Sequence, residues 1–266
     1  MFTIDKSLCI DCGTCVDECH NCALTQGSEG VEYNPSKCIM CGHCLAVCPR
    51  DAIMIDGDGY DCEDVEEFNF SKKQDPSKIR EMIMMRRSVR RFEEKEVPDE
   101  VIQQILEAGK YAPTAKNGQG NAFMVVRSPE QLDKLLEQTA DALERKGNEL
   151  AAAGVPLSNF FLGKAREFKE EQKDGIYYNA PVVIFIFSNL DLDAALAGAN
   201  MGFMAQALGL GYTYLMLPRD AFQDETFAKE FPAPEGLKCA IAMIMGYPEP
   251  EYFCSVPRKN PPTIWK

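Results

Sequence analysis

Apolar residues recur at helical spacing in several stretches beyond residue 76. The clearest is Asp99–Gly109, whose valine, isoleucines and leucine would share one face of a helix. Two uninterrupted apolar runs, Phe123–Val126 and Val182–Phe187, have the length of buried strands. Because helices and strands alternate, the pattern predicts a layered α/β or α+β domain. Further helices are predicted over 77–85, 130–150, 160–173 and 198–208, and a last strand over 239–245.

The first 56 residues have a different pattern. Nine of the twelve cysteines fall within the first 48 residues. Positions 9–24 and 38–53 repeat one arrangement, four cysteines followed by Ala-Leu or Ala-Ile, which indicates two pseudo-symmetric halves. Such a short segment supplies little apolar core, so its fold must depend on the metal centres that the cysteines hold.

An acidic segment separates these two parts. Residues 57–76 contain seven acidic residues against two lysines and show no apolar period, which is typical of a linker. We therefore predict a small metal-dependent domain over 1–56, a linker over 57–76 and a larger domain over 77–266.

Charge and cysteine content exclude several classes of protein. The formal net charge of −13 argues against a general nucleic-acid or membrane-surface binder, since either surface would repel the chain. There is no apolar run of about 18 residues. No basic segment followed by an apolar stretch opens the sequence, so a cytoplasmic location is expected. Thiols stay reduced there, which favours metal ligation over disulfides.

Each cysteine run has the spacing Cys-x2-Cys-x2-Cys-x3-Cys, which gives three thiolates on one loop and a fourth on the following turn. Iron–sulfur cubes use this arrangement, whereas zinc, the alternative, uses two separated pairs. The segment resembles bacterial two-cluster ferredoxins, in which the fourth cysteine of each run ligates the other cluster. The resemblance implies two 4Fe–4S clusters, one held by Cys9, Cys12, Cys15 and Cys48 and the other by Cys38, Cys41, Cys44 and Cys19.

Two positions depart from the ferredoxin pattern. His20 stands where that family has proline, and Cys22 stands where glycine is usual. Cys22 could be a spare ligand, but free cysteine packs as a small hydrophobe, so a buried thiol is expected. His20 and His43 are expected to be polar loop residues, because each cluster already has four thiolates.

The segment Arg86–Phe92 places four arginines and a serine in an otherwise acidic chain. Guanidinium groups bind phosphate bidentately, so the segment suits a phosphate site. It could equally be a solvated face, or form ion pairs with Glu93, Glu94 and Glu96. Taken alone, the arginines leave these alternatives open.

The spacing Arg-x-Ser-x-Arg-x-Phe also resembles the start of the flavin domain in the nitroreductase family. The resemblance covers about residues 77–260. It implies an α+β protein: a small ferredoxin-like two-cluster domain followed by an FMN-binding α/β domain with a mixed sheet flanked by helices. Further segments match that family in the expected order, namely Ala108–Gln119, Asn179–Pro181 with the strand after it, Gly209–Gly211, Gly246–Pro248 and Arg258.

The same resemblance implies FMN at the interface of an obligate homodimer. By position it puts Arg86, Ser88, Arg90 and Arg258 around the phosphate, ribityl chain and pyrimidine edge of the flavin. A cation at the pyrimidine edge would stabilise the anionic reduced flavin. The flavin of the other subunit would be reached by Pro113, Thr114, Ala115 and Asn117, and the remaining expected cofactor-binding residues are Arg87, Leu217, Pro218 and Gly246.

Two segments depart from the nitroreductase pattern. Gly120-Asn121 stands where the family usually has tryptophan and proline, and Met216-Leu217-Pro218 stands where it often has a glycine pair. Both would lie beside the reactive edge of the flavin. The identity of the substrate is therefore the part of the resemblance that transfers least.

Together these features predict an oxidoreductase. Electrons would enter at the clusters from a ferredoxin or NAD(P)H, pass singly to FMN, and leave as a hydride to a nitroaromatic, quinone or activated alkene. In one alternative NAD(P)H reduces the flavin directly, and in another the protein only carries electrons for a larger complex. No catalytic acid or base is assigned, because water could supply the proton. Three tyrosines could also supply it but suit the core equally well: Tyr177, Tyr178 and Tyr214.

Overall fold

The computed structural model describes residues 1–266, and the chain divides into two compact units. The first unit comprises Met1–Lys73 and the loop Thr114–Gly118, and the second comprises Gln74–Pro113 and Gln119–Lys266. Most of the acidic segment that we predict to be a linker is thus part of the first unit. No helix in the chain combines the length and apolar character needed to cross a membrane.

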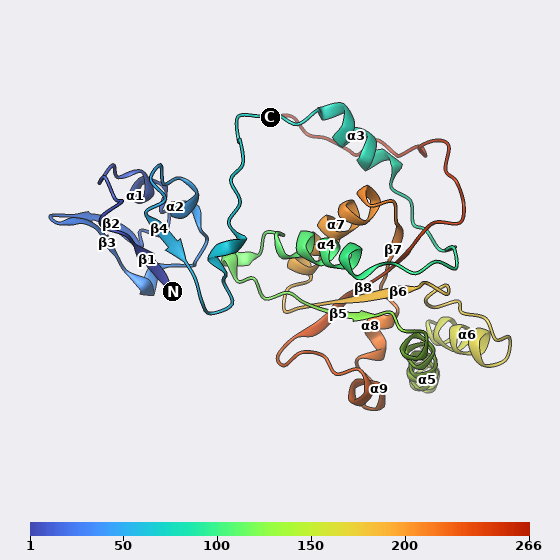
Figure 1. Ribbon diagram of the computed structural model, residues 1–266. Coiled ribbons are helices and arrows are strands. Elements are labelled where there is room, and N and C mark those ends of the chain that lie inside the picture. Colours follow the sequence, from blue (N-terminus) through green and yellow to red (C-terminus); the bar gives the residue numbers. More distant parts are fainter. The chain divides into compact units, whose positions relative to one another are not determined.

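The first unit contains two small antiparallel sheets and two short helices (Figure 1). Its buried core is small and includes a cysteine: Cys15, Leu24, Val31 and Ile53. Fold stability must therefore come in part from whatever the cysteines bind. Strand β1 (Phe2–Ile4) pairs with β4 (Ile53–Ile55), β2 (Leu24–Gly27) pairs with β3 (Gly30–Tyr33), the helices are α1 (Thr14–Glu18) and α2 (His43–Ala46), and the 3-10 turns are η1 (Pro35–Lys37) and η2 (Cys62–Asp64).

The two cysteine runs share one backbone conformation. Asp11 and Met40 occupy equivalent positions and have φ values of 59° and 51°. Gly13 and Gly42, directly before α1 and α2, have φ values of 76° and 75°. A left-handed residue at both places turns the chain sharply, and this geometry agrees with the pseudo-symmetry predicted from the sequence.

The second unit is built on a four-stranded sheet in the order β5-β6-β8-β7. Its strands are β5 (Ala122–Val126), β6 (Val182–Ser188), β7 (Gly211–Leu215) and β8 (Lys238–Gly246). All neighbouring strands pair antiparallel. A mixed sheet, with parallel and antiparallel pairing, was expected. Parallel pairing occurs here as a single isolated bridge between Ser88 and Tyr212. The predicted α+β class is confirmed.

Helices cover both faces of the sheet (Figure 1). All seven residues of β6 are buried, and they alternate between the two sides. Val183, Phe185 and Phe187 contribute to one apolar cluster, and the alternate residues of the strand contribute to the other. The first cluster includes residues of α5 (Pro129–Ala152), α6 (Ser158–Lys169), α8 (Pro218–Ala221) and α9 (Glu225–Glu230), and the second includes residues of α4 (Asp99–Lys110) and α7 (Asp191–Ala207).

Most predicted elements are present, with shifted ends. The helix predicted over 198–208 begins seven residues earlier, as α7 at Asp191. The sequence pattern does not predict these first turns, because they carry aspartates rather than a continuous apolar stripe. Strand β7 and the helices α8 and α9 were not predicted, since each is short. The amphipathic helix over 77–85 exists as α3 (Pro76–Met85), but none of its residues is buried.

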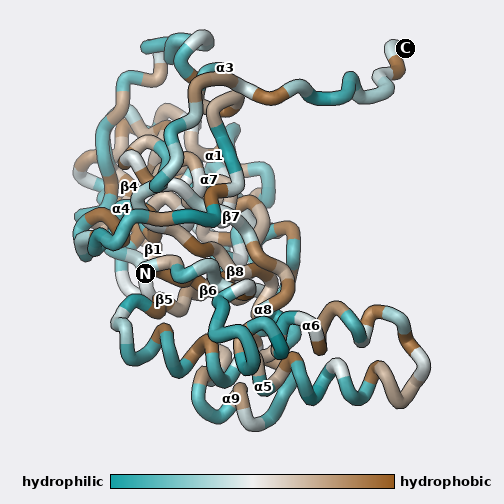
Figure 2. The backbone as a smooth tube through the Cα atoms, turned by 90° about the vertical axis from the view of Figure 1, so that its right-hand side faces the viewer, coloured by the Kyte–Doolittle hydropathy of each residue, from teal (hydrophilic) through white to brown (hydrophobic).

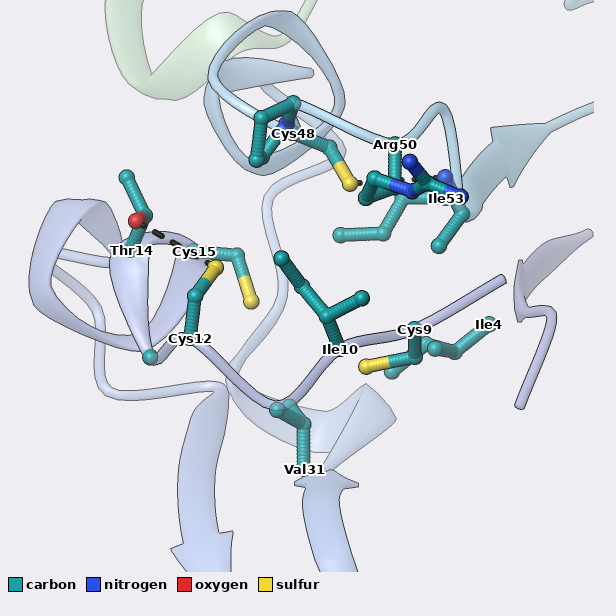
Figure 3. A pocket seen from close by; sticks show the side chains of 13 residues that line it. Ile4, Cys9, Ile10, Cys12, Thr14, Cys15, Val31, Cys48, Arg50 and Ile53 are labelled. Atoms are coloured by element: carbon teal, nitrogen blue, oxygen red, sulfur yellow. Dashed lines mark hydrogen bonds between the residues drawn. The ribbon is translucent and has the colours of Figure 1, made fainter. Parts of the chain in front are cut away.

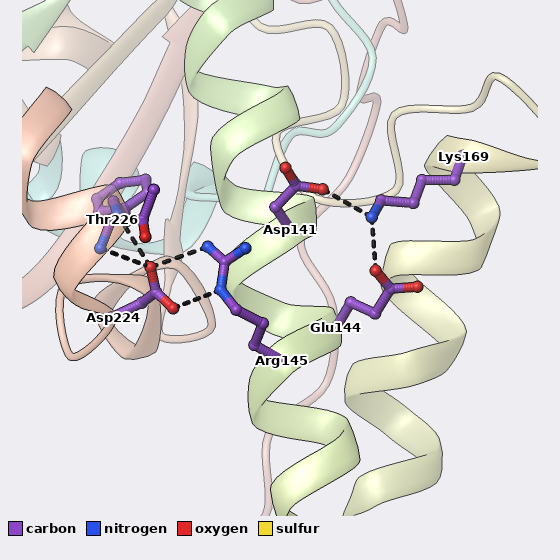
Figure 4. A network of polar contacts seen from close by, with 7 residues as sticks. Asp141, Glu144, Arg145, Lys169, Asp224 and Thr226 are labelled. Carbon is purple, nitrogen blue, oxygen red and sulfur yellow. Dashed lines mark hydrogen bonds and ion pairs between the residues drawn. The ribbon is translucent and has the colours of Figure 1, made fainter.

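A polar network joins three helices of the second unit (Figure 4). Lys169 of α6 lies 2.6 Å from both Asp141 Oδ1 and Glu144 Oε2 of α5. Arg145 of α5 donates through Nε to Asp224 Oδ2 at 2.6 Å and through Nη2 to Oδ1 at 2.9 Å. Asp224 also caps α9, accepting the backbone N–H groups of Thr226 and Phe227. The hydrogen bond from Arg145 is the main cause that lowers the pKa of Asp224.

Replacing Asp224 should separate its two roles. Asp224→Ala removes both the cap and the ion pair, so the free energy of unfolding should fall by about 1–2 kcal/mol. Asp224→Asn keeps an oxygen acceptor for the cap and should cost less. Because the folded-state pKa lies below the ordinary value of 3.8, the charge stabilises the fold at neutral pH, and this contribution is lost as the pH falls below that value. Urea denaturation of the three proteins at pH 7 and pH ~3 measures both effects. Equal losses for the two variants at pH 7 would contradict the capping role.

Candidate functional site

Four cysteines from both runs line one pocket of the first unit (Figure 3). Cys9, Cys12 and Cys15 come from the loop that leads into α1, and Cys48 follows α2. A mainly apolar lining around four thiols suits an iron–sulfur cube, and Thr14 and Arg50 add polar groups to this lining. The wall is mainly formed by Ile4, Ile10, Val31, Ala52 and Ile53.

The other four thiols of the two runs also lie together. Cys41, Cys19 and Cys38 are near enough to act electrostatically on Cys44, and the thiols of the first pocket act in the same way on Cys15. Burial is the main cause that raises the pKa of Cys44 to about 11, and burial also raises the pKa of Cys15. A buried thiol with a raised pKa becomes a thiolate when a bound cation compensates its charge, so both sets fit iron.

Three of these sulfur atoms accept hydrogen bonds from backbone N–H groups. Such bonds stabilise negative charge on a ligating sulfur and tune the reduction potential of a cluster. The donors are Ala23 N to Cys19 Sγ at 3.2 Å, Ala52 N to Cys48 Sγ at 3.3 Å and Met40 N to Cys38 Sγ at 3.3 Å.

The prediction that Cys22 is a buried thiol is wrong. Cys22 is exposed with φ 52°, and the equivalent residue of the other half, Asp51, has φ 51°. The turn that follows each run therefore stays at the surface in both halves. His43 Nδ1 lies 3.2 Å from Glu18 Oε1, and both side chains are largely exposed. His20 is exposed as well, so neither histidine is a buried ligand.

Two hydroxyl groups lie near the thiols, and the cysteine motif itself predicts neither of them. Thr14 Oγ1 lies 3.4 Å from Cys12 Sγ, and this contact is the main cause that lowers the pKa of Cys12. Burial is the main cause that raises the pKa of Tyr33 to about 12, and a hydrogen bond with Cys38 acts in the same direction. Thr14 lies inside a cysteine run and could have been proposed from its position. Tyr33 comes from β3, and only the fold brings it to Cys38.

In the second unit, the arginine-rich segment runs along the end of the sheet. Val89 N donates to Tyr212 O at 3.0 Å, and Glu93 N donates to Tyr247 O at 2.9 Å. A Cβ atom on Gly211 would lie 2.6 Å from the Val89 side chain, so glycine is required there for this close approach. The segment is therefore held by the strands β7 and β8, with Ser88 and Arg90 exposed.

The arginines of this segment have different partners. Arg87 donates to the carbonyl oxygens of Arg86, Met84 and Cys254, and Arg91 pairs with Glu249.

Arg86 and Arg90 form no ion pair with a carboxylate. Arg86 lies near the buried Tyr212, where its charge opposes the burial that raises the pKa of that phenol. Arg90 donates to Ser88 O at 3.3 Å and lies 5.7 Å from the centre of the Tyr178 ring. Two cations without a carboxylate partner, at one edge of the sheet, fit an anionic group such as a phosphate.

The loop Thr114–Gly118 belongs to the first unit and has a strained backbone. Lys116 and Asn117 have φ values of 53° and 52°, a region that residues other than glycine rarely occupy. Asn117 Nδ2 donates to Ile39 O at 3.2 Å and to Met40 O at 2.9 Å. Strained backbone of this kind clusters at functional sites and persists only when its surroundings hold it.

Of the remaining residues of the expected cofactor set, three are packed and two are exposed. Leu217 is half-buried and packs against the core, and Pro218 is buried at the start of α8. A Cβ atom on Gly246 would lie 2.7 Å from the Pro181 ring. Pro113 is exposed, and Arg258 lies in the exposed segment after β8.

Comparison with known families identifies the second unit. The family described as Nitroreductase family matches residues 83–247. The chain belongs to the nitroreductase family. Its first 49 residues match the 4Fe-4S dicluster domain. Both resemblances inferred from the motifs are confirmed, and the chain is an oxidoreductase of this family with a dicluster domain at its start.

Individual proteins that are similar to this chain carry names of the same family. A protein of Archaeoglobus fulgidus with the provisional name NADH dehydrogenase/NAD(P)H nitroreductase is 27% identical over 69% of this chain and 94% of its own length. A protein of Methanothermobacter thermautotrophicus with the same provisional name is 41% identical over 22% of this chain, which is 31% of its own length. The crystal structure of a nitroreductase with bound FMN from Bacteroides fragilis has a TM-score of 0.58 and 23% identity, covering 71% of this chain and 98% of that one.

In this member of the nitroreductase family, two of the three candidate tyrosines are core residues. Tyr177 is buried, and its hydroxyl lies 2.8 Å from Thr139 Oγ1. Tyr214 donates to Gly198 O at 2.7 Å. Burial raises the pKa of both phenols. Tyr178 is half-buried and lies beside Arg90, with φ 59°.

One polar residue of this nitroreductase-family domain lies outside the expected cofactor-binding set. Asn121, which departs from the family pattern, donates through Nδ2 to Asp193 O at 3.3 Å, while its Oδ1 is buried without a hydrogen-bond partner. A buried acceptor of this kind suits a donor group of a bound molecule.

Proposed function

We propose that this chain binds FMN and two 4Fe–4S clusters and passes electrons from an external one-electron donor to a small, electron-poor organic acceptor. The observation that carries the proposal is the combination of two four-thiol sets with a nitroreductase-family domain in one chain. The FMN bound in the Bacteroides fragilis structure supports the choice of flavin. Nitroaromatics, quinones and activated alkenes are the acceptor classes that this chemistry serves.

When bound, FMN supplies hydride chemistry and the clusters supply single-electron transfer. Arg86, Ser88 and Arg90 would hold its phosphate, ribityl chain and pyrimidine edge, with Arg258 as a further cation. The loop Pro113–Asn117 would contact the flavin of the other subunit. Cys9, Cys12, Cys15 and Cys48 would hold one cluster, and Cys38, Cys41, Cys44 and Cys19 the other. The burial of Tyr177 and the hydrogen bond from the Tyr214 hydroxyl to Gly198 O favour water as the source of the proton at the acceptor.

A second copy of the chain is the partner that the exposed apolar residues favour. Helix α3 has no buried residue, and Ile83 and Met85 are 54% and 59% exposed. The segment after β8 carries Phe253 and Trp265, which are 88% and 90% exposed. Figure 2 shows brown, hydrophobic stretches in this segment as it runs out to the C-terminus. Apolar surface of this kind is normally covered in a protein–protein interface. Light scattering should therefore give the mass of a dimer, and removal of residues 250–266 should shift it toward the monomer. A full-length monomer at micromolar concentration would contradict this proposal.

The electron donor can be identified by anaerobic stopped-flow absorbance. A reduced ferredoxin should bleach the clusters and then the flavin, and NADH should act much more slowly. Because the chain carries a net charge of −13, an acidic ferredoxin would be repelled, so its reaction should become faster as salt is added. Flavin bleaching by NADH while the clusters stay oxidised would instead support direct NAD(P)H-dependent reduction, the activity class in the provisional names of the two archaeal relatives. Because eight thiols must stay reduced, we place this activity in the cytoplasm.

A further inference from the structure

Two tyrosines of β7 lie against the middle of α7, within the second unit. Tyr212 and Tyr214 are two positions apart on the strand, so both side chains are on the face of the sheet that α7 covers. Their ring centres are 5.4 Å apart, and Tyr212 is only 3% exposed. Polar hydroxyl groups inside an apolar cluster are costly unless they are hydrogen-bonded, so the partners of these two groups need to be identified.

Two glycines of α7 leave room for the hydroxyl groups. A Cβ atom on Gly202 would lie 2.6 Å from the hydroxyl oxygen of Tyr212 and 2.6 Å from that of Tyr214. One turn earlier, a Cβ atom on Gly198 would lie 3.3 Å from the Tyr214 ring. Glycine weakens the interior of a helix, but here it lets both hydroxyl groups approach the helix backbone.

The directions of the hydrogen bonds follow from the number of protons. Tyr214 donates its single hydroxyl proton to Gly198 O at 2.7 Å. The Tyr214 oxygen can then only accept, so Tyr212 is the donor in the hydrogen bond between the two phenols. The Tyr212 oxygen in turn accepts from Arg86, because a guanidinium group has no acceptor. A chain of three hydrogen bonds therefore runs from Arg86 through both tyrosines to α7.

The backbone on both sides of Arg86 is held by the same elements. Tyr212 O accepts the backbone N–H of Val89 at 3.0 Å. Gln206, one turn after Gly202 on α7, donates through Nε2 to Met82 O in the last turn of α3 at 2.8 Å. The backbone before and after Arg86 is thus fixed by α7 and β7, and the phenol of Tyr212 orients the side chain between these two points.

A phenol orients a guanidinium group without neutralising its charge. Burial is the main cause that raises the pKa of Tyr212, so its hydroxyl group stays protonated and uncharged at neutral pH. Arg91, by contrast, forms an ion pair with the carboxylate of Glu249, which occupies two of its nitrogen atoms. Arg86 therefore keeps its positive charge for an anionic ligand, in an orientation that the tyrosines determine.

We propose that Tyr212 is a positioning residue of the flavin site and that it acts through Arg86. The proposal rests on the proposed function, in which Arg86 contacts FMN, and it adds the reason why this arginine is oriented before the flavin binds. Tyr214 and the carbonyl group of Gly198 anchor Tyr212 in turn. A side chain that is ordered before binding loses less rotamer freedom on binding, so the same contact gives a tighter complex.

Titration of FMN into the apoprotein tests the proposal. Tyr212→Phe keeps the ring and removes the hydroxyl group that holds Arg86, so the dissociation constant should rise about threefold to tenfold. Tyr177→Phe is the matched control, because it removes the hydroxyl group of a buried tyrosine in the other apolar cluster, where the partner is Thr139. Its dissociation constant should stay at the wild-type level. Thermal unfolding of both apoproteins measures how far each substitution perturbs the fold.

A double-mutant cycle separates positioning from a general packing effect. If Tyr212 acts through Arg86, Tyr212→Phe should change FMN affinity by less than about twofold once Arg86→Ala is present. An equal loss of affinity in the presence and absence of Arg86 would overturn the proposal. If Tyr212→Phe does not fold, Tyr214→Phe replaces it in the same cycle, because it removes the group that anchors Tyr212, and the same two results decide.

The outcomes keep the inference apart from the proposed function. A wild-type protein that does not bind FMN would remove the proposed function, and the inference with it. FMN binding that Arg86→Ala weakens and Tyr212→Phe leaves unchanged would overturn the inference alone. FMN binding that neither substitution weakens would also overturn the inference, while the choice of flavin would stand.

Discussion

Replacing Cys48 with alanine is expected to remove the cluster held by Cys9, Cys12 and Cys15 and to spare the cluster of the run in which Cys48 lies. Cys48 lines the same pocket as those three residues, although 33 positions separate it from Cys15 in the sequence. Anaerobically purified protein should contain about eight iron atoms per chain, and the variant about four. The loss should also destabilise the first unit, because only four residues form its buried core cluster.

Cys22→Ala is the matched control for this experiment. Cys22 is an exposed thiol in the turn after the first run and belongs to neither set of four. Iron content, sulfide content and the spectra of both clusters should stay at the wild-type level in that variant. If Cys48→Ala instead disturbs the cluster of Cys38, Cys41 and Cys44, ligation follows the sequence runs and does not cross between them. Stoichiometric zinc in the wild-type protein would exclude the clusters altogether.

The dicluster segment could be predicted well because its information is local. The spacing of the eight cysteines determines which loops form, and the paired glycines at 13 and 42 supply the left-handed turns. The contact of Asn117 with Met40 could not be predicted, since it joins residues 77 positions apart and depends on a strained turn. The residue type of Cys22 favours burial, whereas the turn that it occupies stays exposed, so the prediction for Cys22 is wrong.

In the second unit, too, the elements with a clear local pattern could be predicted and the others could not. The central strand β6 was evident from its apolar run, and α4 was evident from its helical period. Strand β7 was missed because its short run of glycine, threonine and aromatic residues gives no clear alternation. Helix α3 was predicted from a real amphipathic pattern, yet its apolar side chains are exposed within this chain. A single sequence does not distinguish an apolar face that packs internally from one that packs on a second subunit.

Arg86→Ala is expected to weaken FMN binding about tenfold to a hundredfold. A charge-assisted contact to phosphate contributes about 1.5–3 kcal/mol, which corresponds to that change in the dissociation constant. Arg86 has no carboxylate partner, so its removal leaves no buried acid unpaired, and the effect should fall on the ligand rather than on the fold. Titration of FMN into the apoprotein, followed by the quenching of flavin fluorescence, measures the dissociation constant. Thermal unfolding of the apoprotein should differ little from the wild type.

Arg91→Ala provides the control because Arg91 lies five residues away in the same cluster and carries the same charge. Its guanidinium group is occupied by Glu249, with Nε to Oε2 at 3.1 Å and Nη2 to Oε1 at 2.5 Å. This exposed pair contributes little to stability, and its loss should change FMN affinity less than twofold. A general loss of positive charge would weaken both variants alike, and added salt would reduce the difference from wild type. If Arg86→Ala binds FMN as tightly as Arg91→Ala does, the phosphate is held by other residues, and Arg90 and Arg258 are the next to be replaced.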